Sequence, residues 1–249
     1  NCMMVAKKIK PGAAFDHRHI CVEPDPDPET SWVERDRMFA LPRSSWDDYD
    51  RKLISKGGGI RPRSAKSIPL SEQMRKVLDT DATALPPTEL IRCILKAPID
   101  LLYNGGIGTY IKANSETDAS VGDRANDAVR VNGRDLRCKV FGEGGNLGAT
   151  QLGRIEFALN GGRICTDAID NSGGVDCSDH EVNIKILLNG VVAEGELTDK
   201  QRNKLLMEMT DEVATLVLRD NYFQTQILSV TRARGTELVD AQARFMRRL

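Results

Sequence analysis

The sequence predicts an α/β fold with a mostly parallel sheet, followed by a helical C-terminal region. Two apolar runs, ending near Glu143 and near Ala168, each lead into a tight turn rich in glycine and asparagine. Between them, residues 151–160 carry apolar side chains at helical spacing, and a glycine pair supplies a stop signal. Strand, helix and strand in this order form a unit with parallel strands. From Thr198 onward the pattern indicates helices only.

Local signals add further elements. Two Ser-x-x-Glu pairs, beginning at Ser31 and Ser178, predict helix starts, the second for a helix closed by Asn189-Gly190. Asn132-Gly133 lies between two apolar runs and predicts a tight hairpin. Helical spacing predicts helices over 71–78 and 88–96. Apolar runs predict strands near 13–22, 99–103, 136–142 and 163–168.

Composition favours an ordinary soluble protein. The 249 residues are 40% hydrophobic and 29% charged, with a formal net charge of -1. This balance gives no reason to expect nucleic acid or a membrane surface as a partner. No apolar run approaches the roughly 18 residues of a spanning helix, and the first residues do not read as a signal peptide. We therefore expect a cytoplasmic protein.

The glycine- and asparagine-rich turns have the chemistry of a ligand site. They follow predicted strands at 104–106, 144–146 and 171–174. Open α/β sheets bind ligands at the carboxyl ends of their strands. Glycine lets the backbone approach a flat ring or a phosphate, and asparagine offers both a donor and an acceptor. A helix N-terminus after the last turn would favour a bound carboxylate.

Asp16 interrupts the apolar run at 13–22. In a dinucleotide-binding unit, an acid at the end of the second strand accepts hydrogen bonds from the adenosine ribose. Asp16 is in the right place for this role and would favour NAD over NADP, although nearby Arg18 weakens that inference. A solvated loop carboxylate is the alternative. The glycine fingerprint that should precede the first helix is not found in these residues.

Two other patterns leave alternatives open. His17, His19 and Cys21 alternate, so they could share one face of a strand as metal ligands, but structural or cleft-lining histidines are favoured and no metal site is predicted. Lys56 precedes three glycines without the spacing of a P-loop. A mobile loop is favoured there over a phosphate cradle.

Several motifs together resemble one family. Glu-Gly-Gly-Asn at 143–146 and Asp-Ala-Ile-Asp-Asn-Ser-Gly-Gly-Val at 167–175 resemble the cofactor-cleft signatures of amino-acid dehydrogenases, glutamate dehydrogenase in particular. The amino-acid sequence of these motifs is most similar to that of the large bacterial NAD-specific glutamate dehydrogenases. Asp-Leu-Leu-Tyr-Asn-Gly-Gly-Ile-Gly-Thr-Tyr at 100–110 and Ala-Phe-Asp-His-Arg-His-Ile at 14–20 add to the resemblance. It covers at least Ala13 to Leu188.

The resemblance implies a Rossmann-type, mostly parallel sheet that lacks its first strand. The phosphate-binding glycine turn would then lie upstream of Asn1. We accordingly expect an N-terminally truncated NAD-binding domain over residues 1–190 and a helical C-terminal region over residues 191–249.

The resemblance also implies roles for individual residues. Asp16 would hold the adenosine ribose, Asn146 the nicotinamide-side ribose and Asn171 the nicotinamide carboxamide. Ser178 occupies the position that meets the distal carboxylate of glutamate, although Asp179-His180 stands after it where aromatic residues are usual. The cofactor-binding set predicted in full is Asp16, Asn104, Gly105, Gly106, Gly144, Gly145, Asn146, Asn171 and Gly173.

The implied reaction is the NAD-dependent oxidative deamination of L-glutamate to 2-oxoglutarate and ammonia. In the family, the catalytic lysine and the acid/base carboxylate precede the nucleotide domain, so no catalytic residue is predicted here and the chain alone should not turn over. The full-length protein is expected to be a homo-oligomer. One alternative is a related dehydrogenase acting on leucine, phenylalanine or valine. The other is a catalytically silent regulatory or assembly module that keeps the nucleotide fold.

Overall fold

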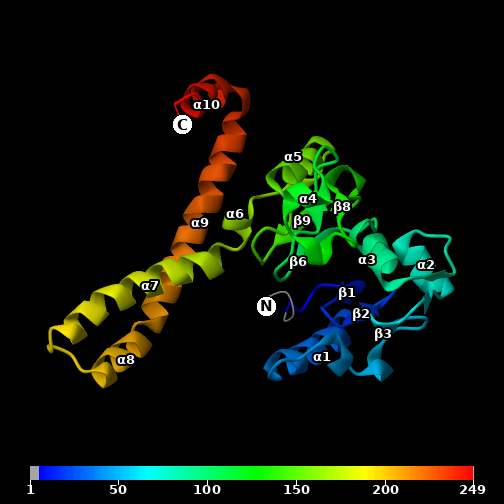
Figure 1. Cartoon of the computed structure of the whole chain (residues 1–249), viewed down its shortest axis with the longest axis horizontal. Coiled ribbons are helices and arrows are strands. Elements are labelled where there is room, and N and C mark those ends of the chain that lie inside the picture. Colours follow the sequence, from blue (N-terminus) through cyan, green and yellow to red (C-terminus); the bar gives the residue numbers. More distant parts are fainter. Residues whose placement is uncertain (1–5, 249) are drawn as a thin grey trace. The chain divides into compact units, whose positions relative to one another are not determined.

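We describe residues 6–248 of the chain in a computed structural model (Figure 1). The chain divides into two compact units, Asn1–Asp167 and Ala168–Leu249. The first unit contains all the described strands together with helices, and the second is helical. The α/β class with parallel strands is confirmed. The division into domains after residue 190 concerns function rather than compactness, and it stays a prediction.

Three parallel strands form the central sheet of the first unit. They are β6 (Leu101–Asn104), β9 (Val140–Glu143) and β10 (Arg163–Ile164), in the order β10-β9-β6. Helix α5 (Gln151–Leu159) connects β9 to β10, which confirms the predicted order of strand, helix and strand. The last strand is shorter than the predicted 163–168, because residues 167–170 form a helix. The register pairs the last residue of β6 with the last residue of β9. These two strands therefore end side by side.

Local signals explain where α5 begins and ends. The Thr150 side-chain oxygen accepts the Gly153 N–H at 2.9 Å and so caps the N-terminus. Phe157, only 1% exposed, holds the buried face in the core. The helix ends before Gly161, which takes a φ of +89° that a side chain would disfavour. The helix thus starts immediately after the turn that follows β9.

The single strand predicted over residues 13–22 is wrong. The run forms two antiparallel strands joined by a turn, because the Asp16 carboxylate accepts the N–H groups of Arg18 and His19, both at 2.7 Å. A third strand pairs with the far edge of the second. This antiparallel sheet consists of β1 (Ala13–Phe15), β2 (His19–Val22) and β3 (Gly59–Pro62).

The hairpin predicted at Asn132-Gly133 is also wrong. The chain enters the 3-10 turn Gly133–Asp135 instead of folding back. A Cβ on Gly133 would come within 2.5 Å of the Gly153 carbonyl oxygen, so this glycine is needed where the chain packs against α5. The remaining strands form two small sheets: β4 (Ile68–Pro69) antiparallel to β5 (Ala84–Leu85), and β7 (Ile111–Lys112) parallel to β8 (Val131–Asn132).

The first helix starts one turn earlier than predicted. Asp27 caps it by accepting the Thr30 N–H at 2.9 Å, and Pro28 occupies its first turn. Ser31 therefore lies buried inside the helix instead of capping it. The helices predicted at 71–78 and 88–96 are confirmed as α2 and α3. Besides α5 and the 3-10 turn Gly133–Asp135, this unit contains the helices α1 (Pro28–Ala40), α2 (Glu72–Leu78), α3 (Pro87–Leu95) and α4 (Asp118–Val121), with 3-10 turns at Trp46–Asp48, Arg51–Leu53 and Arg124–Asn126.

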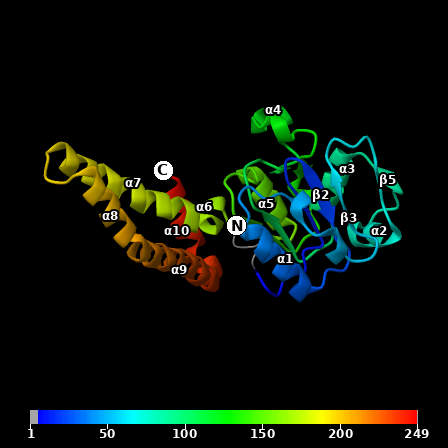
Figure 2. The ribbon, with the colours of Figure 1, turned by 90° about the horizontal axis from the view of Figure 1, so that it is seen from below.

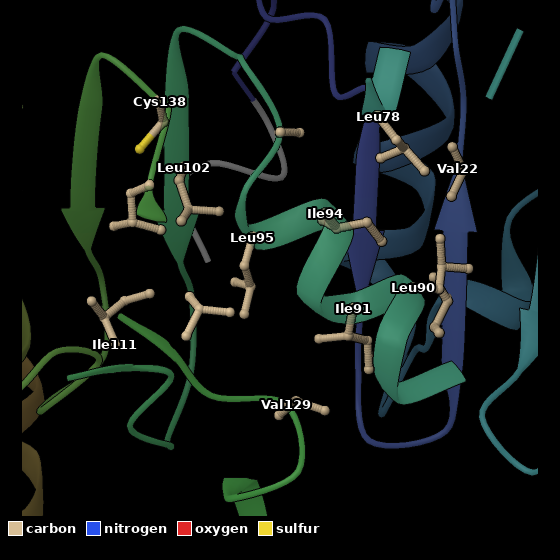
Figure 3. Close-up of a cluster of buried hydrophobic side chains, with 14 of the residues drawn as sticks. Val22, Leu78, Leu90, Ile91, Ile94, Leu95, Leu102, Ile111, Val129 and Cys138 are labelled. Carbon is tan, nitrogen blue, oxygen red and sulfur yellow. The ribbon is translucent and has the colours of Figure 1, made fainter. Parts of the chain in front are cut away.

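Helix α3 forms the centre of the core. Its residues Leu90, Ile91 and Leu95 are at most 3% exposed. Figure 3 shows α3 between the green strand that carries Leu102 and the blue strand that carries Val22. One apolar cluster therefore joins the parallel sheet to the antiparallel sheet.

The second unit confirms the predicted helical pattern. Thr198 caps α8 in a reciprocal capping box with Gln201. Helices α7 and α9 pack against each other and α8 contacts both (Figures 1 and 2). Within residues 6–248, none of the helices combines the length and apolar character needed to cross a bilayer. The helices are α6 (Asp167–Asp170), α7 (Ser172–Ala193), α8 (Asp199–Glu208), α9 (Thr210–Arg234) and α10 (Val239–Met246), with a 3-10 turn at Gly235–Leu238.

The helix start predicted at Ser178 is wrong. The N–H groups of Gly174 and Val175 already donate to the Asn171 carbonyl, at 3.0 and 3.1 Å, so the glycine pair lies inside the first turn of α7. Ser178 follows within the helix, where its hydroxyl contacts the Gly174 carbonyl at 3.4 Å. The helix also continues beyond Asn189-Gly190, to Ala193.

Truncating the centre of the core should destabilise the first unit strongly. Ile91 is 0% exposed, so Ile91→Ala removes buried methyl groups and leaves a cavity, lowering the free energy of unfolding by about 2–5 kcal/mol. Ile107→Ala is the matched control, because Ile107 is 96% exposed and its truncation should change stability by less than about 0.5 kcal/mol. Urea unfolding followed by circular dichroism measures both. Equal effects would contradict the role assigned to α3.

Candidate functional site

The predicted turns after β6 and β9 lie against each other. The N–H groups of Gly144 and Gly145 both donate to the Asn104 carbonyl oxygen, at 2.8 and 3.2 Å. A Cβ on Gly145 would overlap the backbone of Gly106. The parallel register therefore brings together two of the three glycine- and asparagine-rich turns that the sequence singled out.

Close packing explains several glycines in these turns. A Cβ on Gly144 would overlap the Tyr103 hydroxyl, and one on Gly148 would overlap the Asn104 side-chain amide. Gly106 is different, because a Cβ there would meet nothing within 4 Å and its φ is not positive. The fold itself does not require glycine at position 106. A molecule that approaches the backbone closely from outside the chain would require it.

A buried ion pair supports the turn after β9. Glu143 is 0% exposed, and both of its oxygens accept from the Arg154 guanidinium at 2.9 Å. The Ala149 N–H also donates to Glu143, at 3.1 Å. Arg154 further pairs with Asp167 at 3.2 Å, and Asp167 accepts the Leu147 N–H at 2.8 Å. The sequence did not predict this network. It shows Glu143 as the first residue of the Glu-Gly-Gly-Asn turn but does not indicate which side chains pair with it.

The network holds a strained residue in place. Leu147 has a φ of +57°, an unfavourable conformation for a bulky side chain. Besides the Asp167 contact, its carbonyl accepts the Thr109 hydroxyl at 2.7 Å. Asn146, immediately before it, is exposed at the tip of the turn. The strain is thus overcome by fixed contacts, which leave the tip accessible.

A second buried arginine fixes the chain after β6. The Arg130 side chain is 0% exposed and pairs with Asp118 and Asp127, both at 2.7 Å. It also donates to the Thr109 carbonyl at 2.9 Å, while the Thr109 N–H donates to Asp123 at 2.8 Å. Burial raises the pKa of Asp123, but hydrogen bonds from Asn126 and Thr109 outweigh it and the pKa is lowered. Residues 109–130 are therefore clamped beside the turn at 104–106.

Asp16 lies in the turn between β1 and β2, with its carboxylate already engaged. Besides the two N–H groups of its own turn, it accepts the Trp46 N–H at 2.9 Å. Burial raises the pKa of Asp16, but these three donors outweigh it and hold the pKa below its ordinary value. The ribose role of Asp16 stays a prediction, and the structure gives this carboxylate a definite local function as well.

Lys56 and the glycines after it form a packed loop. Gly57 takes a φ of +84°, and its carbonyl accepts the Ser71 hydroxyl at 2.7 Å. A Cβ on Gly58 would come within 2.6 Å of the Ile54 side chain and 2.7 Å of the Val22 carbonyl. Two of the three glycines are thus explained by backbone conformation and packing, which favours the structural alternative.

The predicted residues of the second unit cluster at the start of α7. Asn171 stands at the N-cap and is half-buried. A Cβ on Gly173 would meet nothing within 4 Å, as at Gly106, and Ser178 is exposed. Among residues 6–248, the side chains whose donor atoms lie close enough together to hold a metal ion are Asp176, His180 and Asp220, and His17, His19 and Cys21 are not among them.

Comparison with known proteins identifies the family. The sequence model described as "Bacterial NAD-glutamate dehydrogenase, catalytic domain" matches residues 1–231. The chain belongs to this family. It is 60% identical over 246 residues to the NAD-specific glutamate dehydrogenase of Pseudomonas aeruginosa and 59% identical over 249 residues to that of Mycobacterium tuberculosis. The alignments cover 99% and 98% of the chain but only 15% of each relative. The resemblance stated from the motifs is thereby confirmed.

Breaking the Glu143–Arg154 pair should destabilise the first unit. Arg154→Met leaves a fully buried carboxylate without its bidentate partner, which typically costs about 3–5 kcal/mol. Arg134→Met is the matched control, because Arg134 is exposed and its contact with Asp135 is 3.8 Å long. Denaturant unfolding at neutral pH compares the two. A loss below about 1 kcal/mol for Arg154→Met would contradict the importance of the pair.

The Asp16 turn should make stability depend on pH in acid. Because the folded pKa of Asp16 lies below the unfolded value of about 3.9, its stabilisation is complete above that value and is lost as the pH falls through the folded pKa. Asp16→Asn should therefore cost roughly 1–3 kcal/mol at pH 7, a difference that shrinks below about pH 4. Urea unfolding over this range, with exposed Asp81→Asn as control, measures it. A difference independent of pH would contradict the assignment.

Proposed function

We propose that the chain forms the cofactor-binding part of an NAD-dependent glutamate dehydrogenase, which converts L-glutamate to 2-oxoglutarate and ammonia. The observation that carries the proposal is the pair of glycine- and asparagine-rich turns at the adjacent carboxyl ends of β6 and β9. Family membership supports it, because relatives that share 56–60% identity are named NAD-specific glutamate dehydrogenase. These names belong to much longer proteins, because the chain aligns with only 15% of the length of each relative.

We propose a Rossmann-type arrangement for the nucleotide domain. Three parallel strands with a helix between β9 and β10 support this, because open parallel sheets bind nucleotides beyond their carboxyl ends. The antiparallel sheet formed by β1, β2 and β3 is an addition to such a scheme. Within the proposal, the NAD-binding domain spans residues 1–190 and the helical region residues 191–249.

The residues of the first unit fit the demands of a dinucleotide. Gly106 offers open backbone with no side chain to block a ring or a ribose. The exposed Asn146 tip is held by the network below it, so an amide there can meet a ribose hydroxyl without first being ordered. Asn104, Gly105, Gly144 and Gly145 would contact the cofactor along the two adjacent turns. Asp16 would accept from the adenosine ribose through the remaining lone pairs of its carboxylate.

The residues of the second unit carry separate proposed roles. Asn171, at the N-cap of α7, would bind the nicotinamide carboxamide, and Gly173 would leave its approach open. Ser178, exposed on α7, would meet the distal carboxylate of glutamate. When bound, NAD supplies the hydride acceptor for the reaction. The chain's own residues orient the cofactor and substrate, and we assign none of them to proton transfer. A cytoplasmic location and a homo-oligomeric intact protein are further parts of the proposal.

A substitution at Gly106 tests the cofactor site directly. A Cβ at position 106 meets nothing within the chain, so Gly106→Ala should leave stability unchanged but place a methyl group where the cofactor approaches. We expect NAD affinity to fall about tenfold or more, measured by isothermal titration into the intact protein that carries the chain. Gly190→Ala is the matched control, because its Cβ also meets nothing within 4 Å.

The same titration separates the alternatives. Binding of NAD but not NADP, weakened by Gly106→Ala and by Asn171→Ala, would support the proposal. Unchanged affinity in both variants would place the cofactor elsewhere, and no binding in the intact wild-type protein would favour a silent module. NADH production with leucine, phenylalanine or valine in place of glutamate would indicate a related dehydrogenase.

A further inference from the structure

Three ionisable side chains converge between the two long helices of the second unit. Asp176 and His180 stand one turn apart on α7, and Asp220 faces them from α9. His180 Nε2 lies 3.4 Å from Asp220 Oδ2 and 3.8 Å from Asp176 Oδ1. One donor atom from each side chain can be chosen so that all lie within 4.8 Å of one another. No role from the cofactor site involves these residues.

The donor atoms are buried although the side chains are partly exposed. His180 Nε2 and Asp176 Oδ2 each have less than 1 Å² of accessible surface and make no hydrogen bond among the described residues, although Nε2 lies within ion-pairing distance of both aspartates. Buried polar atoms of this kind are normally satisfied, because leaving them unpaired costs free energy. Two carboxylates beside a histidine nitrogen also repel each other unless a positive charge lies between them, which either a metal ion or a protonated imidazole supplies.

Further polar atoms follow the same two helices. Ser172, one turn before Asp176 on α7, is 2% exposed, and its hydroxyl has no partner among the described residues. Gln224, one turn after Asp220 on α9, likewise has a buried and unpartnered side-chain oxygen. The packed faces of α7 and α9 thus contain a polar stripe where apolar contacts would be ordinary. Polar groups beside a metal site can orient its ligands and its bound water.

The distances suit a divalent transition-metal ion. Nitrogen and oxygen ligands bind such ions at about 2.0–2.2 Å, so neighbouring ligand atoms in tetrahedral geometry are roughly 3.3–3.6 Å apart. The two separations from His180 are 3.4 and 3.8 Å and the donor atoms of all three side chains lie within 4.8 Å of one another, so side-chain movements of about 1 Å reach this range. One histidine and two carboxylates form a donor set that suits zinc, iron(II) or manganese(II). Arg219 contacts the other oxygen of Asp220 at 3.4 Å and leaves Oδ2 for the ion.

We propose that Asp176, His180 and Asp220 form a binding site for one divalent first-row transition-metal ion. The ion would tie α7 to α9, and so brace the helix whose first turns carry Asn171 and Ser178. The side chains are 18–32% exposed, which leaves part of the coordination sphere open to water. The site is distinct from the cofactor roles proposed above and does not depend on them.

Manganese(II) is the suitable probe, because it prefers oxygen and nitrogen ligands whereas zinc would also bind the exposed Cys177 thiol beside the site. The intact protein that carries the chain is freed of metal with a chelator and titrated with Mn²⁺, while free Mn²⁺ is followed by electron paramagnetic resonance. We expect one Mn²⁺ per chain that His180→Ala abolishes and that Asp220→Asn weakens at least tenfold. His17→Ala and Asp211→Asn, exposed residues outside the cluster, should change nothing.

Two readouts keep the test decisive. Pulsed resonance of the bound Mn²⁺ should show coupling to an imidazole nitrogen, which only the His180 variant removes. Asp220→Asn keeps the size of the side chain, so it answers the question even where His180→Ala does not fold. Equal Mn²⁺ binding in the wild type and both variants, or bound Mn²⁺ without nitrogen coupling, would overturn the proposal. Absence of Mn²⁺ binding would do the same and would leave His180 as an ion-pair partner of the two aspartates.

Discussion

The buried Glu143–Arg154 pair is the interaction on which the candidate cofactor site depends. A carboxylate with no exposed surface at the end of β9 is tolerable only with a partner, and α5 supplies it with bidentate geometry. Because Arg154 is also bound to Asp167, one guanidinium connects the end of β9, the turn above it and the chain beyond β10. The turn between them therefore has little freedom. A binding loop that is ordered before the ligand arrives loses less entropy on binding.

A common principle governs both buried arginines of the first unit. Arg154 pairs with the carboxylates of Glu143 and Asp167, Arg130 pairs with aspartates and with backbone carbonyls, and each supports one of the two adjacent turns. Irregular backbone must find partners for its polar groups, and a short loop cannot supply them all from within. Arginine, with five donors in a rigid fork, satisfies several acceptors at once. The ion pairs and hydrogen bonds of the two buried arginines thus fix the glycine-rich turns, while the apolar core around α3 holds the two sheets together.

Sequence patterns predicted the elements whose signals are local and unambiguous. The helix over 88–96 has apolar residues on one face, and the strand, helix and strand unit around α5 has clear turn residues at its ends. Errors arose where one residue type serves two purposes. Asp16 was predicted to end a strand, because the sequence does not show that its carboxylate accepts hydrogen bonds within a turn. Gly133 was predicted to lie in a hairpin, because the helix that packs against it, α5, comes later in the sequence. The contacts that decide these cases are tertiary, and no local pattern contains them.

The glycines show how structure separates two meanings of one motif. The motif Glu-Gly-Gly-Asn suggested glycines that bind a ligand. Gly144 and Gly145 are nevertheless required by packing, because a Cβ on either would overlap Tyr103 or Gly106. Gly106 and Gly173, in contrast, have neither a positive φ nor a neighbour that excludes a Cβ. Gly173 also weakens the first turn of α7 relative to alanine, because glycine is a poor helix former. A residue that the fold does not need, and that helix stability disfavours, calls for a reason outside the chain. Close approach of a bound cofactor is the reason that we propose for Gly106 and Gly173, because both lie in the glycine- and asparagine-rich turns, whereas Gly190, equally open, lies outside them.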